Sequence, residues 1–287
     1  MVKATRMGVF LLAFCAGFAC LAADNHGATE RVRLIAGLAE EKAYLPRFHA
    51  IRALENEPPL SDAERAALTA FLRRTDGTEG TDEMELAALK NDVAERLLSL
   101  PDMPGCFARD LLDMQADPAQ SATWRNYCIQ FLGRAYTATP DAELRKTVRE
   151  RLYALADADG PETCGTALMS LASLNGHPEI DSLRVSDCAM ALAKDAAKAE
   201  GLRFTALQVA ADLSHADATQ TAREWLAREK SANMRAVAIG ILGKHGASSD
   251  RALIEPYVDT PDPRLSGAAR AALKHLRGVG LGNPVGD

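Results

Sequence analysis

Residues 234–243 read MRAVAIGILG and residues 124–133 read WRNYCIQFLG, so Arg, Ile, Leu and Gly occur at the same places without a gap. In both stretches apolar residues stand three and four positions apart, the spacing that places them on one face of a helix. A pattern that returns within one chain indicates an internal repeat, and the length of that repeat limits which architectures are possible.

The repeat length can be read from further, more divergent copies of this pattern. Copies begin at residues 46, 124, 163, 202, 234 and 265, which are 78, 39, 39, 32 and 31 residues apart. Because 78 is twice 39, we expect one more copy near residue 85, where Glu85-Leu86-Ala87-Ala88-Leu89 stands. A period of this length with two amphipathic helices per unit is typical of stacked helical hairpins. We therefore predict an all-α protein, a right-handed α-solenoid of about seven hairpins.

The composition of the chain also favours helices. Hydrophobic residues make up 47% of the 287 residues and aromatic residues only 5%, and long stretches consist of strong helix formers. Ser61-Asp62-Ala63-Glu64 is a capping box, which predicts a helix start. Three dipeptides place a capping side chain before a proline and predict further helix starts: Asp117-Pro118, Thr139-Pro140 and Asp262-Pro263.

The first 23 residues are typical of a cleaved export signal. Lys3 and Arg6 precede an apolar run at residues 7–22 that ends in small residues. This run is shorter than the about 20 apolar residues that a transmembrane helix needs. We expect cleavage near Ala22 or Ala23 and a periplasmic or secreted protein of a bacterial envelope.

Cys20 leaves a second interpretation of this segment open. It is the candidate lipidation site of a bacterial lipoprotein, although Gly17 stands where such signals usually have Leu. Membrane anchoring is expected only through this cysteine. Beyond the signal, we expect a repeat domain at residues 24–276 and a flexible, glycine-containing tail at residues 277–287.

The net charge argues against a nucleic-acid partner. The full chain carries a formal charge of −6, and loss of Lys3 and Arg6 with the signal changes it to −8. A protein that binds DNA or RNA needs a basic face to neutralise phosphates. We see no cluster of Lys and Arg without interspersed Asp or Glu, so we do not expect nucleic acid to be the partner.

One known family resembles this sequence. Residues 234–246, followed by Ala252-Leu253-Ile254 and Asp262-Pro263, resemble the HEAT repeat, including its short bacterial form. The resemblance is clearest over residues 200–276 and extends more loosely over residues 120–175. Ser266 stands where the family usually has a basic residue, so the last unit is expected to be an end cap. The resemblance implies a binding scaffold of armadillo-type helical repeats.

Four cysteines remain after removal of the signal: Cys106, Cys128, Cys164 and Cys188. An even number in an oxidising compartment favours disulfides. Reflecting positions about the turns near Pro118 and His177 brings Cys106 opposite Cys128 and Cys164 opposite Cys188, so we predict these two bridges. The alternative, a reactive thiol or a metal site, lacks Cys-x-x-Cys spacing.

No catalytic template matches the sequence. The six histidines are scattered without His-x-x-x-His spacing, and there is no Gly-x-Ser-x-Gly elbow, phosphate loop or His-Glu-x-x-His. The helical-repeat family includes an iron hydroxylase that carries His-Glu pairs, whereas this sequence contains no His-Glu dipeptide. We therefore expect no enzyme activity, no metal site and no cofactor.

Arginines begin several of the expected second helices, at Arg47, Arg125, Arg203 and Arg235. The structural interpretation is that each pairs with an acidic residue in the adjacent turn, and the alternative is a ladder that binds a ligand. Trp and Tyr beside Arg are frequent anchors of interfaces, although an aromatic residue at these places also suits the core. The candidates for partner binding are Trp124, Arg125, Tyr127, Arg203 and Arg235.

The function predicted from these observations is an exported, non-catalytic scaffold that binds a protein partner through the concave face of the solenoid. One alternative is a lipid-anchored architectural subunit of an envelope complex. Another is a lyase-like accessory enzyme, since some similar short helical repeats serve bilin attachment, but those proteins work in the cytoplasm and the export signal argues against this. Fold and function are loosely linked in such scaffolds, so the sequence does not identify the partner.

Overall fold

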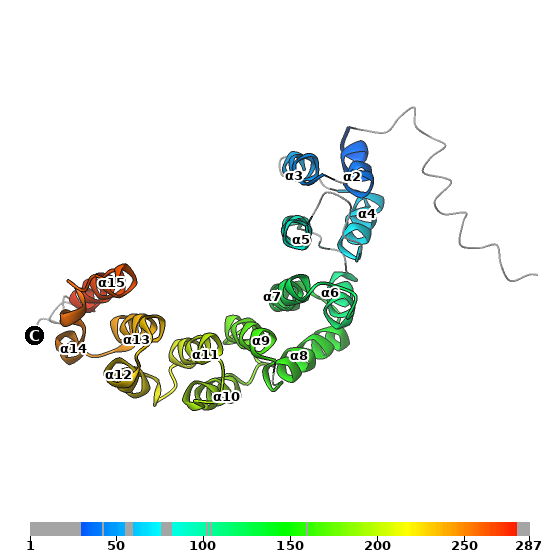
Figure 1. Cartoon of the computed structure of the whole chain (residues 1–287). Coiled ribbons are helices and arrows are strands. Elements are labelled where there is room, and N and C mark those ends of the chain that lie inside the picture. The colour runs from blue at the N-terminus through cyan, green and yellow to red at the C-terminus, as the bar shows by residue number, and fades with distance from the viewer. Residues whose placement is uncertain are drawn as a thin grey trace, which may run out of the picture. The chain divides into compact units, whose positions relative to one another are not determined.

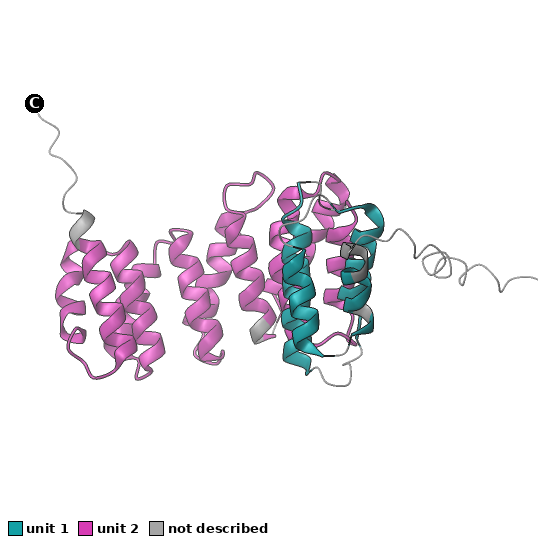
Figure 2. Cartoon of the chain, turned by 90° about the horizontal axis from the view of Figure 1, so that it is seen from above, with its two compact units in different colours: residues 1–101 teal, residues 102–287 magenta. Residues whose placement is uncertain are grey.

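The computed structural model describes residues 30–41, 43–54, 60–75, 82–101, 103, 105–158 and 160–279, and these residues form helices and turns without a β-strand. The chain divides into two compact units, residues 1–101 and residues 102–287 (Figure 2). The predicted signal at residues 1–23, Cys20 within it and residues 280–287 of the predicted tail lie outside the described residues. Within the described ranges, every helix is too short or too polar to span a membrane.

Unit 1 contains two helical hairpins in its described part. Helix α2 (Glu30–Glu40) is followed by α3 (Tyr44–Ala53), and α4 (Asp62–Leu72) by α5 (Glu83–Leu98). The second helices of the two hairpins, α3 and α5, pack side by side, and the first helices α2 and α4 pack likewise (Figure 1).

The described residues of unit 2 form five hairpins, the last of which begins with short helical turns. The elements in chain order are α6 (Phe107–Ala116), α7 (Ala122–Ala138), α8 (Ala142–Ala156), α9 (Pro161–Ser173), α10 (Ser182–Lys194), α11 (Glu200–Asp212), α12 (Ala218–Arg228), α13 (Ala232–His245), η1 (Ser248–Asp250), α14 (Arg251–Ile254), η2 (Glu255–Tyr257) and α15 (Pro263–Val279). Helix α15 continues three residues past the expected start of the tail after residue 276. The second helices α7, α9, α11, α13 and α15 form one layer, and the first helices form the other (Figure 1).

Each copy of the repeated pattern lies near the start of a second helix, in α3, α5, α7, α9, α11, α13 and α15. The copy expected from the doubled gap, residues 85–89, falls in α5 as expected. Two hairpins in unit 1 and five in unit 2 confirm the prediction of an all-α solenoid of about seven hairpins.

Two pairs of neighbouring second helices, α7 with α9 and α13 with α15, approach closely at the same register of the repeat. A Cβ on Gly133 would lie 3.0 Å from the Cβ of Ser170 in α9, and a Cβ on Gly243 would overlap Ala272 in α15. Each glycine stands nine residues after the start of its pattern, and each neighbour stands seven residues after the start of the next. Absence of a side chain at these two positions therefore lets the helix backbones pack at short range.

Two of the predicted helix starts are confirmed. Ser61 and Glu64 form the capping box at the start of α4, in which the Glu64 amide donates to Ser61 Oγ at 3.3 Å and the Ser61 amide donates to Glu64 Oε2 at 2.7 Å. Helix α15 begins at Pro263, directly after Asp262.

The two other Pro dipeptides were assigned to the wrong side of a turn. Asp117 and Thr139 are the C-caps of α6 and α7. Thr139 Oγ1 donates back to the main-chain oxygen of Ala135 at 2.7 Å, so its hydroxyl serves the preceding helix. The N-caps of the following helices are Ser121 and Asp141. A proline suits the residues just after a helix as well as its first turn, which the dipeptide alone does not distinguish.

Candidate functional site

The recurrent arginines close the ends of the first helices. In three hairpins of unit 2, the arginine near the start of the second helix donates from Nε to a main-chain oxygen at or next to the end of the first helix. These bonds join Arg125 to Gln115 at 3.2 Å, Arg203 to Ala193 at 3.3 Å and Arg235 to Glu229 at 2.5 Å. The last carbonyl groups of a helix lack partners within it, so each guanidinium stabilises a helix end.

The expected pairing of each arginine with an acidic side chain therefore needs correction. Arg125 and Arg235 bond to main-chain oxygens instead of carboxylates. Arg203 does form an ion pair, with Glu229 Oε1 at 3.1 Å, and its guanidinium lies 5.2 Å from the ring centre of Trp225. Arg47 is 1% exposed, with its guanidinium 5.6 Å from the ring centre of Phe71. Arg125, Arg203 and Arg235 thus all bond within the protein to main-chain oxygens, and Arg203 bonds to a carboxylate as well.

In other hairpins a different side chain donates a hydrogen bond to the main-chain oxygen at the end of the first helix. The sequence did not reveal these donors. Cys164 occupies the arginine position in α9, and its thiol donates to the main-chain oxygen of Ala156, the last residue of α8, at 3.0 Å. In α5 and α15 the position of the arginine is occupied by Leu86 and Ser266. A cationic side chain one helical turn later donates to the helix end instead. Those bonds join Lys90 Nζ to the Arg74 oxygen at 2.5 Å and Arg270 Nη2 to the Val258 oxygen at 3.0 Å.

The predicted disulfide between Cys106 and Cys128 is not present, since both cysteines are thiols in the structure. Cys106 is the exposed N-cap of α6, whereas Cys128 is fully buried in the middle of α7. Two residues at equal distances from a turn lie at the same height on the two helices of a hairpin. Their side chains can still project from different faces, as these two cysteines do. Burial and the neighbouring carboxylate of Asp110 raise the pKa of the Cys106 thiol.

Cys164 and Cys188 are likewise thiols, so the second predicted bridge is also absent. Both side chains lie at the end of α8 but contact different atoms there. The Cys164 thiol donates to the Ala156 oxygen, and the Cys188 sulfur lies 3.9 Å from Asp157 Oδ1. Burial and the charge of Asp157 raise the pKa of Cys188. A raised pKa lowers the fraction of reactive thiolate at neutral pH.

The two aromatic candidates in α7 differ in their surroundings. Trp124 is 0% exposed and lies 6.2 Å from Phe131 between ring centres, so it belongs to the core. A partner cannot contact it without opening the hairpin, and Trp124 is therefore removed from the candidate interface. Tyr127 is half-buried and remains available to a partner.

The second helices α7, α9, α11 and α13 carry uncharged residues at equivalent, accessible repeat positions. Six residues after the start of the pattern stand Gln130, Met169, Gln208 and Gly240, all exposed, and three residues after it stand Tyr127, Thr205 and Val237, all half-buried. We call these seven residues the uncharged strip. Because α7, α9, α11 and α13 contact one another in turn, equal register places the members of the strip on neighbouring helices.

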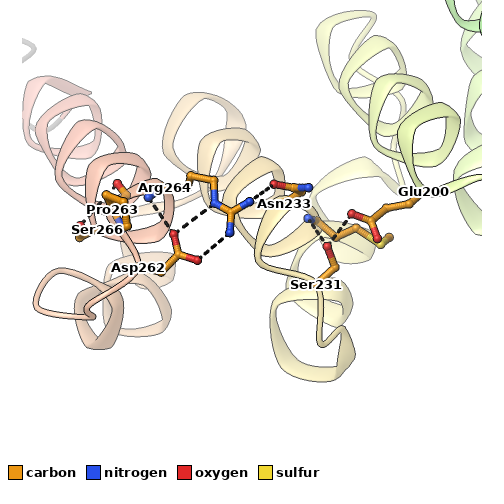
Figure 3. Close-up of polar contacts among 8 residues, drawn as sticks. Glu200, Ser231, Asn233, Asp262, Pro263, Arg264 and Ser266 are labelled. Carbon is orange, nitrogen blue, oxygen red and sulfur yellow. Dashed lines mark hydrogen bonds and ion pairs between the residues drawn. The ribbon is translucent and has the colours of Figure 1, made fainter.

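Polar contacts between hairpins border the strip at the starts of the helices. Figure 3 shows Glu200 accepting from Ser231 Oγ at 2.5 Å, and Arg264 donating to Asn233 Oδ1 at 2.9 Å and to Asp262 Oδ2 at 3.0 Å. These contacts link α11 to the N-cap of α13, and α13 to α15. They fix the register of the last three hairpins.

The ends of α11 and α13 form a second border of the strip. Asp212 contacts Lys244 Nζ at 2.7 Å and His245 Nε2 at 3.0 Å. Burial raises the pKa of Asp212, but hydrogen bonds from Lys244 and His245 outweigh it and the pKa lies below its ordinary value. The charged groups at both borders thus pair within the protein and leave the strip between them uncharged.

A separate cleft of about 450 Å³ lies on the layer of first helices, between α6 and α8. It is lined by Arg109, Leu112, Asp113, Ala116, Asp141, Glu143, Leu144, Thr147 and Arg151. Arg151 Nε donates to Gln115 Oε1 at 2.7 Å beside it. Within the described residues, no group of three His, Cys, Asp or Glu side chains is arranged to hold a metal ion.

Comparison with known proteins gives structural neighbours and no relatives by sequence. No protein-family model and no curated protein sequence matches the chain. A designed armadillo repeat protein matches with a TM-score of 0.40 and 15% identity, over 79% of this chain and 98% of that one. Human deoxyhypusine hydroxylase, in complex with glycerol, matches with a TM-score of 0.38 and 18% identity, over 87% and 96%. At these values neither likeness bears on function.

Proposed function

We propose that the protein is a non-catalytic scaffold that holds a protein partner against the uncharged strip of unit 2. The observation that carries this proposal is the recurrence of uncharged, accessible residues at one register on the neighbouring second helices α7, α9, α11 and α13. Each repeat contacts mainly its neighbours in a solenoid, so such a face extends as far as the repeats do and suits an extended partner.

The expected contact residues change from the sequence-based candidates. Arg125, Arg203 and Arg235 close helix ends, so their replacement would disturb the hairpins as well as any interface. Tyr127 and Met169, which is 47% exposed, supply the accessible apolar surface of the strip. Gln130 and Gln208 supply amide donors and acceptors on either side of it.

Export to the bacterial envelope is part of the same proposal. It is supported by the charged start and apolar run of residues 1–23. Mass analysis of the amino terminus of the mature protein tests it: a start at Ala23 or Asp24 supports cleavage and release. A lipid-modified Cys20 at the amino terminus would instead favour the anchored subunit, and an intact Met1 in the cell would contradict export.

Site-specific crosslinking tests the binding face. A photoreactive amino acid replaces Gln130 or Gln208 in the strip, and as matched controls Lys146 or Glu150, which are exposed on the first helix α8. We expect both strip positions to crosslink the same protein in intact cells that express the full chain. Equal crosslinking from α8, or none from either layer, would contradict binding through the strip.

A further inference from the structure

In unit 1, large apolar side chains are exposed to solvent at equivalent positions of the second helices. Leu45 in α3 is 62% exposed and Met84 in α5 is 71% exposed. The two residues are separated by one repeat of 39 residues, and α3 packs against α5 (Figure 1). Neighbouring parallel helices lie about 8–10 Å apart, so equal register places Leu45 and Met84 close together on one face.

Two aromatic rings extend this apolar surface along α3. Tyr44 and Phe48 are half-buried and stack with 5.9 Å between their ring centres. The exposed Arg52 lies with its guanidinium 5.3 Å from the ring centre of Phe48. We call Tyr44, Leu45, Phe48 and Met84 the unit 1 patch.

The same two helices bury cations while they expose apolar side chains. Arg47 is 1% exposed and Lys90 is 2% exposed, although Lys and Arg are among the residues least often buried. Leu45 and Met84, which would gain from burial, stand in solvent. The buried cations have partners inside the unit, whereas the two exposed apolar side chains have most of their surface left uncovered by it. An exposed cluster of large apolar side chains is typical of a surface that binds a partner.

The charges around the patch are mostly acidic. Glu41, Asp82 and Glu83 are exposed at the starts of α3 and α5, and the half-buried Glu85 lies in the first turn of α5. Asp82 and Glu85 accept main-chain hydrogen bonds in a capping box. Carboxylates beside an apolar surface favour a cationic partner and repel anionic lipid headgroups.

We propose that the unit 1 patch binds a cationic amphipathic helix of a partner protein, with its apolar face on Leu45 and Met84 and its Lys or Arg residues against Glu41, Asp82 and Glu83. Two turns of such a helix rise about 10 Å, the separation expected between neighbouring helices. Helices of this kind commonly lie in apolar grooves with anchors at helical spacing. This surface is distinct from the uncharged strip, and its binding does not depend on binding there.

A labelled peptide probes this binding to the full chain by fluorescence anisotropy. The probe is an 18-residue amphipathic helix of Leu and Lys. The comparison peptides keep the Leu positions with Glu in place of Lys, or keep Lys with Gln in place of Leu. We expect the Leu/Lys peptide to bind most tightly, and a rise in salt to weaken it, because exposed charges are screened.

The variant Leu45→Gln with Met84→Gln should weaken the Leu/Lys peptide by about tenfold or more. Leu183→Gln is the matched control, because Leu183 is 69% exposed on α10 of unit 2. No effect of the double substitution, an equal effect of L183Q, or equal binding of the Leu/Glu peptide would overturn the proposal. If the double variant does not fold, as judged by circular dichroism, Glu83→Lys provides the test. It should weaken the Leu/Lys peptide and strengthen the Leu/Glu peptide, and unchanged preference would overturn the proposal.

Two further measurements separate other occupants of the patch. A dimer seen by light scattering that dissociates on Leu45→Gln with Met84→Gln would assign the face to a second copy and overturn the proposal. Cosedimentation with phosphatidylglycerol vesicles that depends on the same two residues would assign it to a membrane and also overturn it. A protein that stays monomeric, does not cosediment with the vesicles and binds the Leu/Lys peptide supports the proposal.

Discussion

Cys164 in α9 donates its thiol hydrogen to the main-chain oxygen of Ala156, 3.0 Å away, at the repeat position from which Arg125 and Arg203 reach the corresponding helix ends. This cysteine therefore does in its hairpin what arginine does in others. Its burial follows from that role, because a thiol that closes the end of α8 must lie between the two helices. The four cysteines consequently have different environments, which can be distinguished chemically.

Alkylation of native protein should distinguish these thiols. Cys106 is exposed and should react first, the partly exposed Cys188 next, and the buried Cys128 and Cys164 only after unfolding. Because the pKa of Cys106 and that of Cys188 are raised, both should react more slowly at pH 7 than a free cysteine. Peptide mass spectrometry without reductant measures the order. Resistance of all four in unfolded protein would restore the two predicted disulfides.

Removal of an arginine that closes a helix end should destabilise its hairpin. Arg125→Ala leaves the Gln115 oxygen without this donor and should lower the free energy of unfolding by about 1–3 kcal/mol. Arg228→Ala is the control, since Arg228 is exposed on α12 and should change stability by less than about 0.5 kcal/mol. Urea unfolding followed by circular dichroism measures both. Equal stability of the two variants would show that the bond to Gln115 contributes nothing.

Two glycines of the same helix should respond in opposite ways to alanine. Gly243→Ala forces a Cβ against Ala272 and should destabilise the protein by about 1–3 kcal/mol. A Cβ on Gly240 meets nothing within 4 Å, so Gly240→Ala should gain up to about 1 kcal/mol from helix propensity. Thermal unfolding of the two variants provides the measurement. A stabilised Gly243→Ala variant would contradict the close packing of α13 on α15.

The ion pair between Arg223 and Asp250 should make stability depend on pH. Asp250 is 2% exposed and accepts from Arg223 Nε at 2.7 Å and Nη2 at 3.0 Å. The hydrogen bond from Arg223 lowers the pKa of Asp250 below its ordinary value. A lowered pKa in the folded state gives stability that is present above the unfolded value of about 3.9 and is lost as pH falls below it.

Asp250→Asn should therefore lower the free energy of unfolding by about 1.5–3 kcal/mol at pH 7. The loss should be smaller at pH 3, because the carboxyl of Asp250 is then largely protonated in the unfolded chain and the native ion pair contributes less stability. Urea unfolding of both proteins at the two pH values measures the difference. Asp259→Asn is the control, because Asp259 is exposed, and should cost little at either pH. A cost of Asp250→Asn that does not change with pH would show that the charge of Asp250 is unimportant.

The architecture could be predicted from the sequence because the repeated pattern marks the second helix of every hairpin. Even the divergent copy in α5 was located, by the spacing of its neighbours alone. Helix ends were harder to predict. Ser61 has a reciprocal partner in Glu64 three residues later, whereas Thr139 before Pro140 offers a hydroxyl that either neighbouring helix can use. The residues at such a turn do not show whether the side chain bonds to the preceding helix or to the following one.

The candidate site was less accessible to sequence reasoning, for a geometric reason. Spacing predicted that Arg125 and Trp124 lie at the start of a second helix, but not that one contacts a main-chain oxygen and the other the core. Main-chain acceptors have no sequence signature, so the partners of the arginines were assigned to acidic side chains. The i to i+4 relation of Leu86 to Lys90 and of Ser266 to Arg270 was the available signal for the missed donors.

That relation bears on how such a chain diverges. The oxygen at a helix end accepts a donor from either of two places one turn apart, as Arg125 on α7 and Arg270 on α15 demonstrate. A repeat can therefore lose its signature residue and acquire an equivalent one four positions later while the hairpin is preserved. An alignment made column by column scores such an exchange as two mismatches. Exchange of the donor between these two sites therefore lowers the sequence similarity between repeats while the hairpin structure is retained.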